Sequence, residues 1–275
     1  MLLPMLAKRY RDDGHKIEFP CYAQPKLDGV RCLAKRVDGK IKFYSRKGNE
    51  YKTLGHIAKE LDKIIGKDEV LDGEIYIHHK RFQELISAIK NVKNKGNTLI
   101  KNTELQFHIF DYANTVMPYV DRYNILKEKF KGKDFKSLVL VKTDTLKNRK
   151  QVVNKHKQYV KQGYEGLILR NAYGYYRFDY RSDDLQKYKT FVDEEFPILA
   201  VRSGVRSYDG CGTFICQTKD GLPFDVNPKG TLDQKREYLR NRKKYIGKML
   251  IVKYQEKSKD NIPRFAVGIG IRDYE

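Results

Sequence analysis

The sequence predicts an α+β protein with two domains: antiparallel sheets with helices over residues 1–189, then a small β-barrel over residues 190–275. Three observations support this prediction. The 275 residues are 40% hydrophobic and 12% aromatic, which is enough apolar surface for two cores. Strand-like and helix-like runs alternate along the first part of the chain. After LQKYKTFVDEEFP, short strands separated by turn signals replace that pattern.

The strands expected in the first domain are rich in β-branched and aromatic residues. Residues 69–77 (EVLDGEIYI) and 104–112 (ELQFHIFDY) alternate apolar and polar side chains, which is typical of strands with one buried face. The short apolar run YEGLILR, residues 164–170, is expected to be a buried strand. We therefore expect sheets to carry most of this domain.

Three helices are expected between these strands. Residues 81–92 place Phe82, Leu85, Ile86 and Ile89 on one helical face. Two further helices are each expected to end at a glycine: residues 121–132 and residues 148–163. Their amphipathic faces would cover the sheets.

The second domain has the pattern of a small barrel. Its turn signals are SYDG, KDG and NPKG, and strands are expected over residues 248–256 and 264–271. One helix is expected over residues 231–245, with Thr231 and Asp233 at its start and lysines at its end, as capping and the helix dipole favour. About five strands with one helix suggest an OB-fold.

The formal charge of +21 indicates a polyanionic partner, of which nucleic acid is the commonest. The charge is uneven: residues 190–275 contain 16 Lys and Arg against 12 Asp and Glu, which leaves 40 against 23 for residues 1–189. An anionic membrane is less favoured, because no basic amphipathic helix with a bulky apolar face is found. A basic protein without a polyanionic partner remains an alternative.

The cysteines favour a reducing compartment. Cys21, Cys32, Cys211 and Cys216 form no C-x-x-C pair, so zinc is not expected and the thiols are expected to be free. The first residues contain too short an apolar run for a signal peptide, and no later run is long enough to span a membrane. We therefore expect an intracellular, soluble protein, in the cytoplasm or in the nucleus of a host cell if it is viral.

The stretch YAQPKLDGVRC, residues 22–32, contains the most informative lysine. Pro25 fixes its own backbone angle before Lys26, and Asp28-Gly29 marks a tight turn where a ligand can approach the backbone. A lysine becomes a nucleophile when neighbouring positive charge or loss of solvent lowers its pKa. Arg31 could supply such a charge. Without further motifs, a solvated lysine at a strand end is the simpler interpretation.

Further motifs follow in order, and together they carry a resemblance. They contain these residues: Arg46 in SRKG, Glu74 in LDGEIYI, Phe110 in IFDY, Glu165 in YEGLILR, Lys187 and Lys189 in RSDDLQKYK, and Arg264 and Arg272 in PRFAVGIGIRD. With KLDGVR, these motifs resemble those of the nucleotidyltransferases that attach a nucleotide to lysine: ATP-dependent DNA ligases, RNA ligases and mRNA capping enzymes. Both ends of the chain look most like the compact viral ATP-dependent DNA ligases.

The resemblance implies an adenylation (nucleotidyltransferase) domain over residues 1–189 and an OB-fold domain over residues 190–275. It implies that ATP adenylates Lys26, that the AMP passes to the 5′-phosphate of a nick in duplex DNA, and that the 3′-hydroxyl displaces it. It also implies Mg²⁺, with Mn²⁺ as a substitute, a monomer, and a role in DNA replication, repair or recombination.

The resemblance also implies a role for each residue. Those expected to bind ATP or AMP are Arg31, Glu74 at the ribose, Phe110 stacked on the purine, and Lys187 and Lys189 on the α-phosphate. Those expected to hold phosphates at the nick are Arg46, Arg170 and Arg181, with Arg31 helping at the 5′-phosphate. Glu165 and Glu74 are the metal candidates, and Arg264 and Arg272 would orient the pyrophosphate.

Several alternatives stay open at this point. The two glutamates could be solvated carboxylates, and Phe110 could belong to the core. A capping guanylyltransferase or an RNA ligase would use the same lysine chemistry. An inactive OB-type nucleic-acid-binding protein would belong to a different functional class. Because the sequence leaves little room for a long insertion in the second domain, we expect the basic surface to hold DNA and binding to be steeply salt-dependent.

Overall fold

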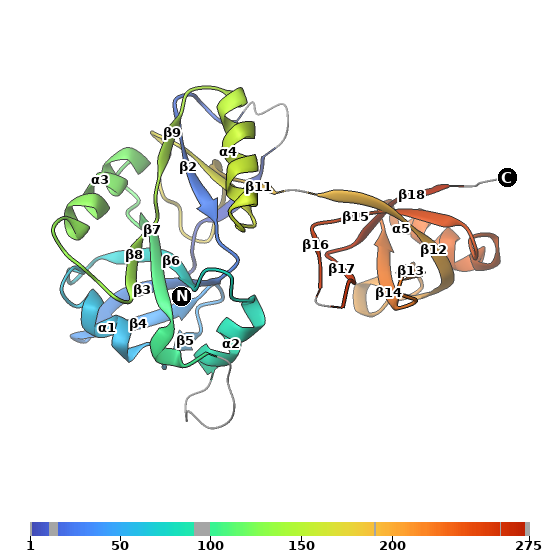
Figure 1. Cartoon of the computed structure of the whole chain (residues 1–275), viewed down its shortest axis with the longest axis horizontal. Coiled ribbons are helices and arrows are strands. Elements are labelled where there is room, and N and C mark those ends of the chain that lie inside the picture. The colour runs from blue at the N-terminus through green and yellow to red at the C-terminus, as the bar shows by residue number, and fades with distance from the viewer. Residues whose placement is uncertain (1, 11–15, 91–99, 190, 259, 273–275) are drawn as a thin grey trace. The chain divides into compact units, whose positions relative to one another are not determined.

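The computed structural model describes residues 2–10, 16–90, 100–189, 191–258 and 260–272 (Figure 1). The chain divides into two compact units, Met1–Lys189 and Thr190–Glu275. In the described part of the chain, no helix has both the length and the apolar character needed to cross a membrane.

The first unit contains two sheets. The six-stranded sheet consists of β5 (Glu50–Tyr51), β4 (Lys40–Ser45), β3 (Val30–Val37), β6 (Val70–Tyr76), β7 (Gln106–Tyr112) and β8 (Leu138–Leu140), in that order. The five-stranded sheet consists of β1 (Leu6–Arg9), β11 (Arg181–Lys189), β10 (Gly166–Asn171), β2 (Cys21–Lys26) and β9 (Asp144–Leu146). The expectation of sheets with helices is confirmed.

The expectation that these sheets are antiparallel is wrong at their edges. Strand β1 pairs with β11 in parallel, and β7 pairs with β8 in parallel. The interior pairs, including β3 with β6 and β2 with β10, are antiparallel. Periodicity reports which face of a strand is buried but not the direction of its neighbour, so the sequence could not reveal the parallel edges.

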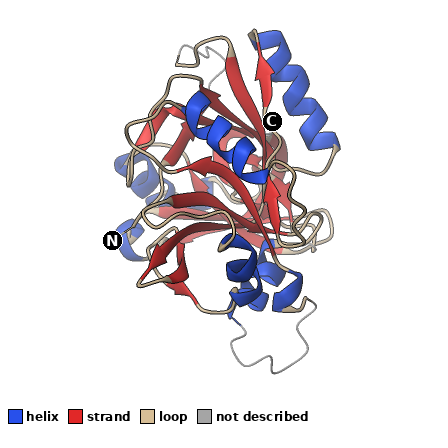
Figure 2. Ribbon diagram, turned by 90° about the vertical axis from the view of Figure 1, so that its left-hand side faces the viewer, coloured by secondary structure: helices blue, strands red, loops and turns tan. Residues whose placement is uncertain are grey.

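Helices cover both sheets (Figure 2). They are α1 (Gly55–Leu61), α2 (Phe82–Lys90), α3 (Tyr119–Phe130), α4 (Arg149–Lys161) and the 3₁₀ turn η1 (Asn102–Glu104). The three expected helices are present as α2, α3 and α4, and residues 91 and 92 of the first expected helix lie outside the described residues. Helix α4 begins where the Asn148 side chain accepts a hydrogen bond from the Gln151 N–H, and it ends before Gly163 at φ +87°.

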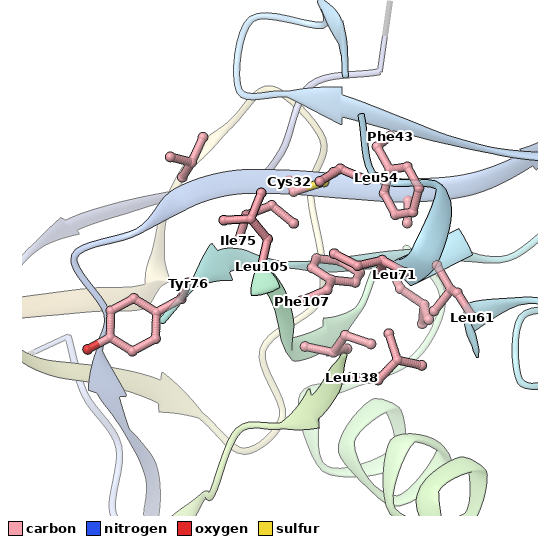
Figure 3. Packing of buried hydrophobic residues seen from close by; sticks show 14 of the residues in the cluster. Cys32, Phe43, Leu54, Leu61, Leu71, Ile75, Tyr76, Leu105, Phe107 and Leu138 are labelled. Atoms are coloured by element: carbon pink, nitrogen blue, oxygen red, sulfur yellow. The ribbon is translucent and has the colours of Figure 1, made fainter. Parts of the chain in front are cut away.

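Two of the three hydrophobic clusters in the described part of this unit pack its sheets against helices. The larger core packs Cys32, Leu71, Ile75 and Phe107 of the six-stranded sheet against apolar residues of α1, α2 and α3 (Figure 3). The smaller core packs β2 and β10 against α4. One face of each sheet is therefore tightly packed against helices, so the ends of its strands can hold side chains at fixed positions.

The second unit contains a barrel that five strands close. In order around the barrel they are β12 (Val192–Ser203), β13 (Gly212–Gln217), β14 (Pro223–Pro228), β18 (Val267–Arg272) and β15 (Met249–Tyr254). The remaining elements are β16 (Glu256–Lys257), β17 (Pro263–Arg264), α5 (Leu232–Arg240), η2 (Arg206–Tyr208) and η3 (Arg242–Lys244). Helix α5 begins in a capping box of Thr231 and Gln234 but ends earlier than expected, because residues 242–244 form the 3₁₀ turn. Arg264 lies on the separate strand β17 and not on the last barrel strand.

Candidate active site

A pocket of about 800 Å³, counting its mouth open to solvent, lies in the first unit. Eight of the predicted site residues line this pocket: Lys26, Arg31, Arg46, Glu74, Phe110, Arg170, Arg181 and Lys187. Residues from both sheets therefore meet in a single cavity.

Strand register brings Lys26, Glu165 and Lys189 together. In the five-stranded sheet, Gly166 on β10 lies opposite Lys26 on one side and opposite Lys189 on the other. The Glu165 carboxylate accepts hydrogen bonds from both lysine amines, one on each oxygen. Its backbone N–H donates to the Lys26 carbonyl at 3.0 Å. The two lysines lie 163 residues apart in the sequence. The pairing of the three strands brings both of them to the Glu165 carboxylate.

Gly166 is required at this position. A Cβ there would lie 2.2 Å from the Tyr188 carbonyl oxygen, and φ is +153°. Because that contact is far inside van der Waals distance, any other residue would push β10 away from β11. The glycine of the YEGLILR motif therefore permits the close pairing of these strands beside Glu165.

The two pocket lysines have lowered pKa values. For Lys26, whose side chain is 19% exposed, burial is the main cause, and Arg31 and Arg46 lower the pKa further. Glu74 and Asp28 act in the opposite direction. For Lys187, burial is again the main cause, followed by the charges of Lys26, Arg181 and Arg46. The positive charges of the pocket therefore favour anions, and Lys26 loses its proton more readily than a lysine in water.

Arg31 is held rigidly by a buried carboxylate. Its Nε and Nη2 donate to the two oxygens of Asp72, each at 2.6 Å, and Asp72 is 0% exposed. The Tyr176 hydroxyl donates to the same carboxylate at 2.7 Å. A bidentate pair of this kind fixes the guanidinium plane, so Arg31 faces the pocket in one orientation. Asp72 is a site residue that the sequence did not single out, although it lies within the LDGEIYI motif.

Glu74 and Phe110 come from the six-stranded sheet. Glu74 on β6 lies opposite Arg31 on β3, and burial raises the pKa of its carboxyl, while Lys26 and Arg31 lower it. The Phe110 ring lies against two guanidinium groups, with Arg31 at 4.9 Å and Arg170 at 5.5 Å from its centroid. Phe110 is half-buried and lines the pocket, so the ring both packs against the core and faces the cavity.

Arg170 lies in the pocket wall but not at the protein surface. It is 3% exposed, its Nε donates to Gln24 at 2.9 Å, and its Nη1 donates to Asp111 at 2.6 Å. Arg122 shares the same carboxylate. Two of its guanidinium nitrogens are thus bonded inside the protein and little of its surface is exposed, and the expectation that it holds a phosphate at the nick stays a prediction.

Arg46 and Arg181 lie where an external phosphate could reach them. The SRKG sequence forms a turn in which the Ser45 hydroxyl accepts from the N–H groups of Lys47 and Asn49, and Gly48 has φ +79°. This turn presents the exposed side chain of Arg46 to the pocket. Arg181 is also exposed, and it donates to the Ala7 carbonyl at 2.6 Å.

Arg264 and Arg272 belong to the second unit. The Arg264 guanidinium lies 5.3 Å from the centroid of the Phe265 ring. Arg272 Nε lies 2.7 Å from Glu195 Oε1, and its side chain is 54% exposed. Both arginines are accessible within their own unit.

The sequence analysis did not identify three other residues of the pocket. Leu6 and Ala7 of β1 line the cavity, and Gln24 lies in its wall two residues before Lys26. The Gln24 amide donates to Tyr119 at 2.9 Å and to the Phe110 carbonyl at 3.2 Å. The alternation along YAQPK could have indicated Gln24, because residues two apart in a strand share a face.

Comparison with protein families assigns both units. Residues 4–189 match the ATP dependent DNA ligase domain, and residues 205–272 match the DNA ligase OB-like domain. The first match covers more than half of the chain, and together the two matches contain nearly all of the described elements.

Individual relatives agree. The DNA ligase of African swine fever virus is 32% identical over 296 residues, which cover 99% of this chain and 69% of the relative. The DNA ligase of phage T4 is 27% identical over 305 residues, which cover 90% of this chain and 62% of the relative.

Solved structures show the same fold. A structure of a Lig E DNA ligase, described as DNA binding with a minimal scaffold, superimposes with a TM-score of 0.79 at 23% identity, covering 99% of this chain and 100% of the other. The chlorella virus DNA ligase-adenylate gives a TM-score of 0.55 at 25% identity over 100% of both chains. With the pocket geometry, these matches identify the chain as a nick-sealing enzyme of the compact viral type that belongs to the ATP-dependent DNA ligase family.

Proposed function

We propose that Lys26 is the residue that carries AMP during nick sealing. Its neutral amine attacks the α-phosphorus of ATP, a P–N bond forms, the P–O bond to pyrophosphate breaks, and the amine loses a proton. The observation that carries this assignment is the position of Lys26 in a pocket with Arg31, Glu74 and Phe110, where burial lowers its pKa.

The same pocket supports roles for its other residues in binding ATP. The Phe110 ring offers a flat apolar surface for the purine, and Glu74 offers an acceptor for the ribose hydroxyls. Lys187 and Lys189 lie on alternating positions of β11 and so share one face, from which both amines can contact the α-phosphate. Arg31 has two donors committed to Asp72, so we assign it to orientation of the phosphate and to the electrostatic potential of the pocket.

Magnesium fits the carboxylates of this site. Glu165 and Glu74 provide hard oxygen donors, and Mg²⁺ is usually held by one or two carboxylates together with substrate phosphates and water. In the described part of the chain, no three His, Cys, Asp or Glu side chains cluster so as to hold a metal unaided. We therefore propose that the phosphates of ATP complete the site. When bound, Mg²⁺ would neutralise charge on the transferring phosphoryl group, and Mn²⁺ could replace it.

The two units would divide the work. We assign the adenylation chemistry to residues 1–189, and we assign to the OB-fold domain, residues 190–275, the arginines that orient the pyrophosphate. Arg264 and Arg272 would orient the pyrophosphate, and Arg272 would exchange its contact with Glu195 for this anion. One chain carries every proposed residue, so we propose that it acts as a monomer.

Nicked duplex DNA is the proposed substrate after adenylation. The exposed cations Arg46 and Arg181 at the mouth of the pocket would hold the 5′-phosphate of the nick. We place Arg170 beneath Phe110 as a residue that positions the pocket wall. AMP would pass from Lys26 to the 5′-phosphate, and the 3′-hydroxyl would then displace it as the phosphodiester forms.

A sealing assay tests the proposal. The wild-type protein should join a 5′-phosphorylated nick in duplex DNA with ATP and Mg²⁺, and Lys26→Ala should not. On a nick that already carries 5′-AMP, Lys26→Ala should retain part of the activity, because the last step needs no lysine nucleophile. Full ATP-dependent sealing by Lys26→Ala would refute the role of Lys26.

A further inference from the structure

A histidine joins the end of β6 to the turn that follows α4. The Nε2 atom of His78 lies 3.1 Å from the Gln162 carbonyl oxygen, and its Nδ1 lies 2.7 Å from the Tyr76 hydroxyl. A carbonyl can only accept, so Nε2 carries the hydrogen, and in the neutral ring Nδ1 accepts from Tyr76. Both ring nitrogens are thus used in one bridge.

The bridge is reinforced by close ring packing. The His78 ring lies 4.7 Å from that of Tyr164 at an interplanar angle of 35°, and 3.8 Å from that of His79. A Cβ on Gly163 would approach His79 Cε1 to 2.8 Å, so a glycine lets the two segments meet. Figure 3 shows the Tyr76 hydroxyl pointing away from the labelled core residues.

The bridge spans the two sheets that build the active site. Tyr76 ends the strand that carries Glu74, in the six-stranded sheet. Tyr164 directly precedes Glu165, whose backbone N–H and carboxylate contact Lys26 at the end of β2 in the five-stranded sheet. Within the described chain, His78 therefore links the strand of one proposed metal carboxylate to the turn of the other.

We infer that His78 is a positioning residue for enzyme adenylation. It holds the turn that contains Glu165 at a fixed position relative to the strand that carries Glu74. This inference rests on the proposed role of Glu165 beside Lys26. His78 touches neither of the pocket carboxylates itself, so it contributes geometry and not charge. Releasing the bridge lets Glu165 move relative to Glu74 while Phe110 and Arg31 stay in place.

The test replaces His78 in two ways. His78→Phe keeps a flat ring for stacking on Tyr164 but removes both hydrogen bonds, and His78→Gln keeps a donor for the Gln162 carbonyl. In single-turnover labelling of the enzyme with ATP, His78→Phe should lower the maximal rate about 10-fold, since small misplacements of catalytic groups have large effects. The ATP concentration at half-maximal rate should stay within about twofold, and His78→Gln should recover most of the rate.

His56→Phe is the matched control. His56 Nε2 lies 2.9 Å from the Leu105 carbonyl, so this variant removes a similar histidine–carbonyl hydrogen bond of the same unit, outside the pocket. It should adenylate at the wild-type rate. Tyr76→Phe should act through the same bridge, so the double variant with His78→Phe should be no slower than His78→Phe alone.

The outcomes separate this inference from the proposed function. If Glu165→Gln slows adenylation but His78→Phe behaves like His56→Phe, the inference is wrong and the role of Glu165 stands. If Glu165→Gln has no effect, the proposed role of Glu165 is wrong, and the inference falls with it. The inference is also overturned if both His78→Phe and His78→Gln adenylate slowly and both have lost thermal stability to the same extent. A slow, stable His78→Phe that Gln rescues supports it.

Discussion

Lys26 lies in an environment that combines loss of solvent with opposed charges. Burial and the neighbouring arginines lower the pKa of its amine, while Glu74 and Asp28 favour the ammonium form. The Glu165 carboxylate accepts a hydrogen bond from the amine and holds it in place. A lysine in this setting keeps its orientation yet loses its proton more easily than a lysine in water.

The pH dependence of enzyme adenylation follows from this environment. Only the neutral amine can attack phosphorus, and the pKa of Lys26 lies below the ordinary value of 10.5. The rate of adenylation should therefore rise with pH, reach half of its maximum below pH 10.5, and level off above that midpoint. Single-turnover labelling at saturating ATP measures this profile. A rate that is constant between about pH 6 and 9 would contradict the assignment of the rising limb to Lys26.

His108 on β7 gives a second pH effect, on stability. Burial, with a smaller effect of His78, lowers its pKa from 6.5 to about 4. The folded protein keeps this ring neutral while the unfolded chain binds a proton, so the stability contribution is complete above pH 6.5 and is lost as pH falls toward 4. The full loss is about 3 kcal/mol.

Urea unfolding of His108→Phe checks this effect. The phenyl ring keeps the edge contact with Tyr76, whose ring centroid lies 5.2 Å away, but cannot titrate. Between pH 6.5 and 4, its free energy of unfolding should fall less steeply than that of the wild type. Equal slopes for the two proteins would show that His108 is not the responsible group.

At the scale of elements, the pairing of β2, β10 and β11 places three site residues at once. Gly166→Ala would put its Cβ 2.2 Å from the Tyr188 carbonyl oxygen, so the strands must separate. We expect a loss of roughly 2 kcal/mol or more in the free energy of unfolding and a severe loss of adenylation. Gly55→Ala is the control, because nothing lies within 4 Å of a Cβ at that position. An active, stable Gly166→Ala would refute the argument from register.

Elements with local signals could be predicted from the sequence. Helix α4 has a capping Asn148 at its start and Gly163 after its end, so both boundaries can be read locally. Helix α1 could not be predicted, because it has only 7 residues, follows Leu54, and has no side-chain cap. Short elements of this kind depend on tertiary packing, which for α1 is the burial of Ile57 and Leu61.

Some features of the site could also be predicted from the sequence, and others could not. Lys26, Glu165 and Lys189 could be named from their motifs, but the pairing that unites them needs the register of three strands. The burial of Arg170 could not be foreseen, because its partner Asp111 lies 59 residues away and is shared with Arg122. A buried charge network of this kind leaves no periodic signal in the sequence.

For the molecule as a whole, we expect the formal charge of +21 to determine most of the affinity for DNA. Residues 1–189 carry most of it, with 40 Lys and Arg against 23 Asp and Glu. Release of counterions from DNA should therefore dominate the binding free energy.

The salt dependence of binding measures this contribution. Fluorescence anisotropy with nicked duplex DNA should show affinity that falls steeply with salt concentration. Arg46→Gln should reduce the slope of log K against log salt by about 1, if Arg46 contacts one phosphate. Arg36→Gln is the control, because Asp62 lies 2.7 Å from the Arg36 guanidinium and already pairs with it. An unchanged slope in Arg46→Gln would remove Arg46 from the DNA contact.

Peptide mapping after incubation with ATP and Mg²⁺ tests whether Lys26 forms the bond to AMP. The intact protein should gain the mass of one AMP, and fragmentation should place that mass on the amine of Lys26. The added group should be stable to alkali and lost in acid, as expected of a phosphoramide. AMP found on another residue, such as Lys187 or Lys189, would contradict the assignment of Lys26 as the nucleophile.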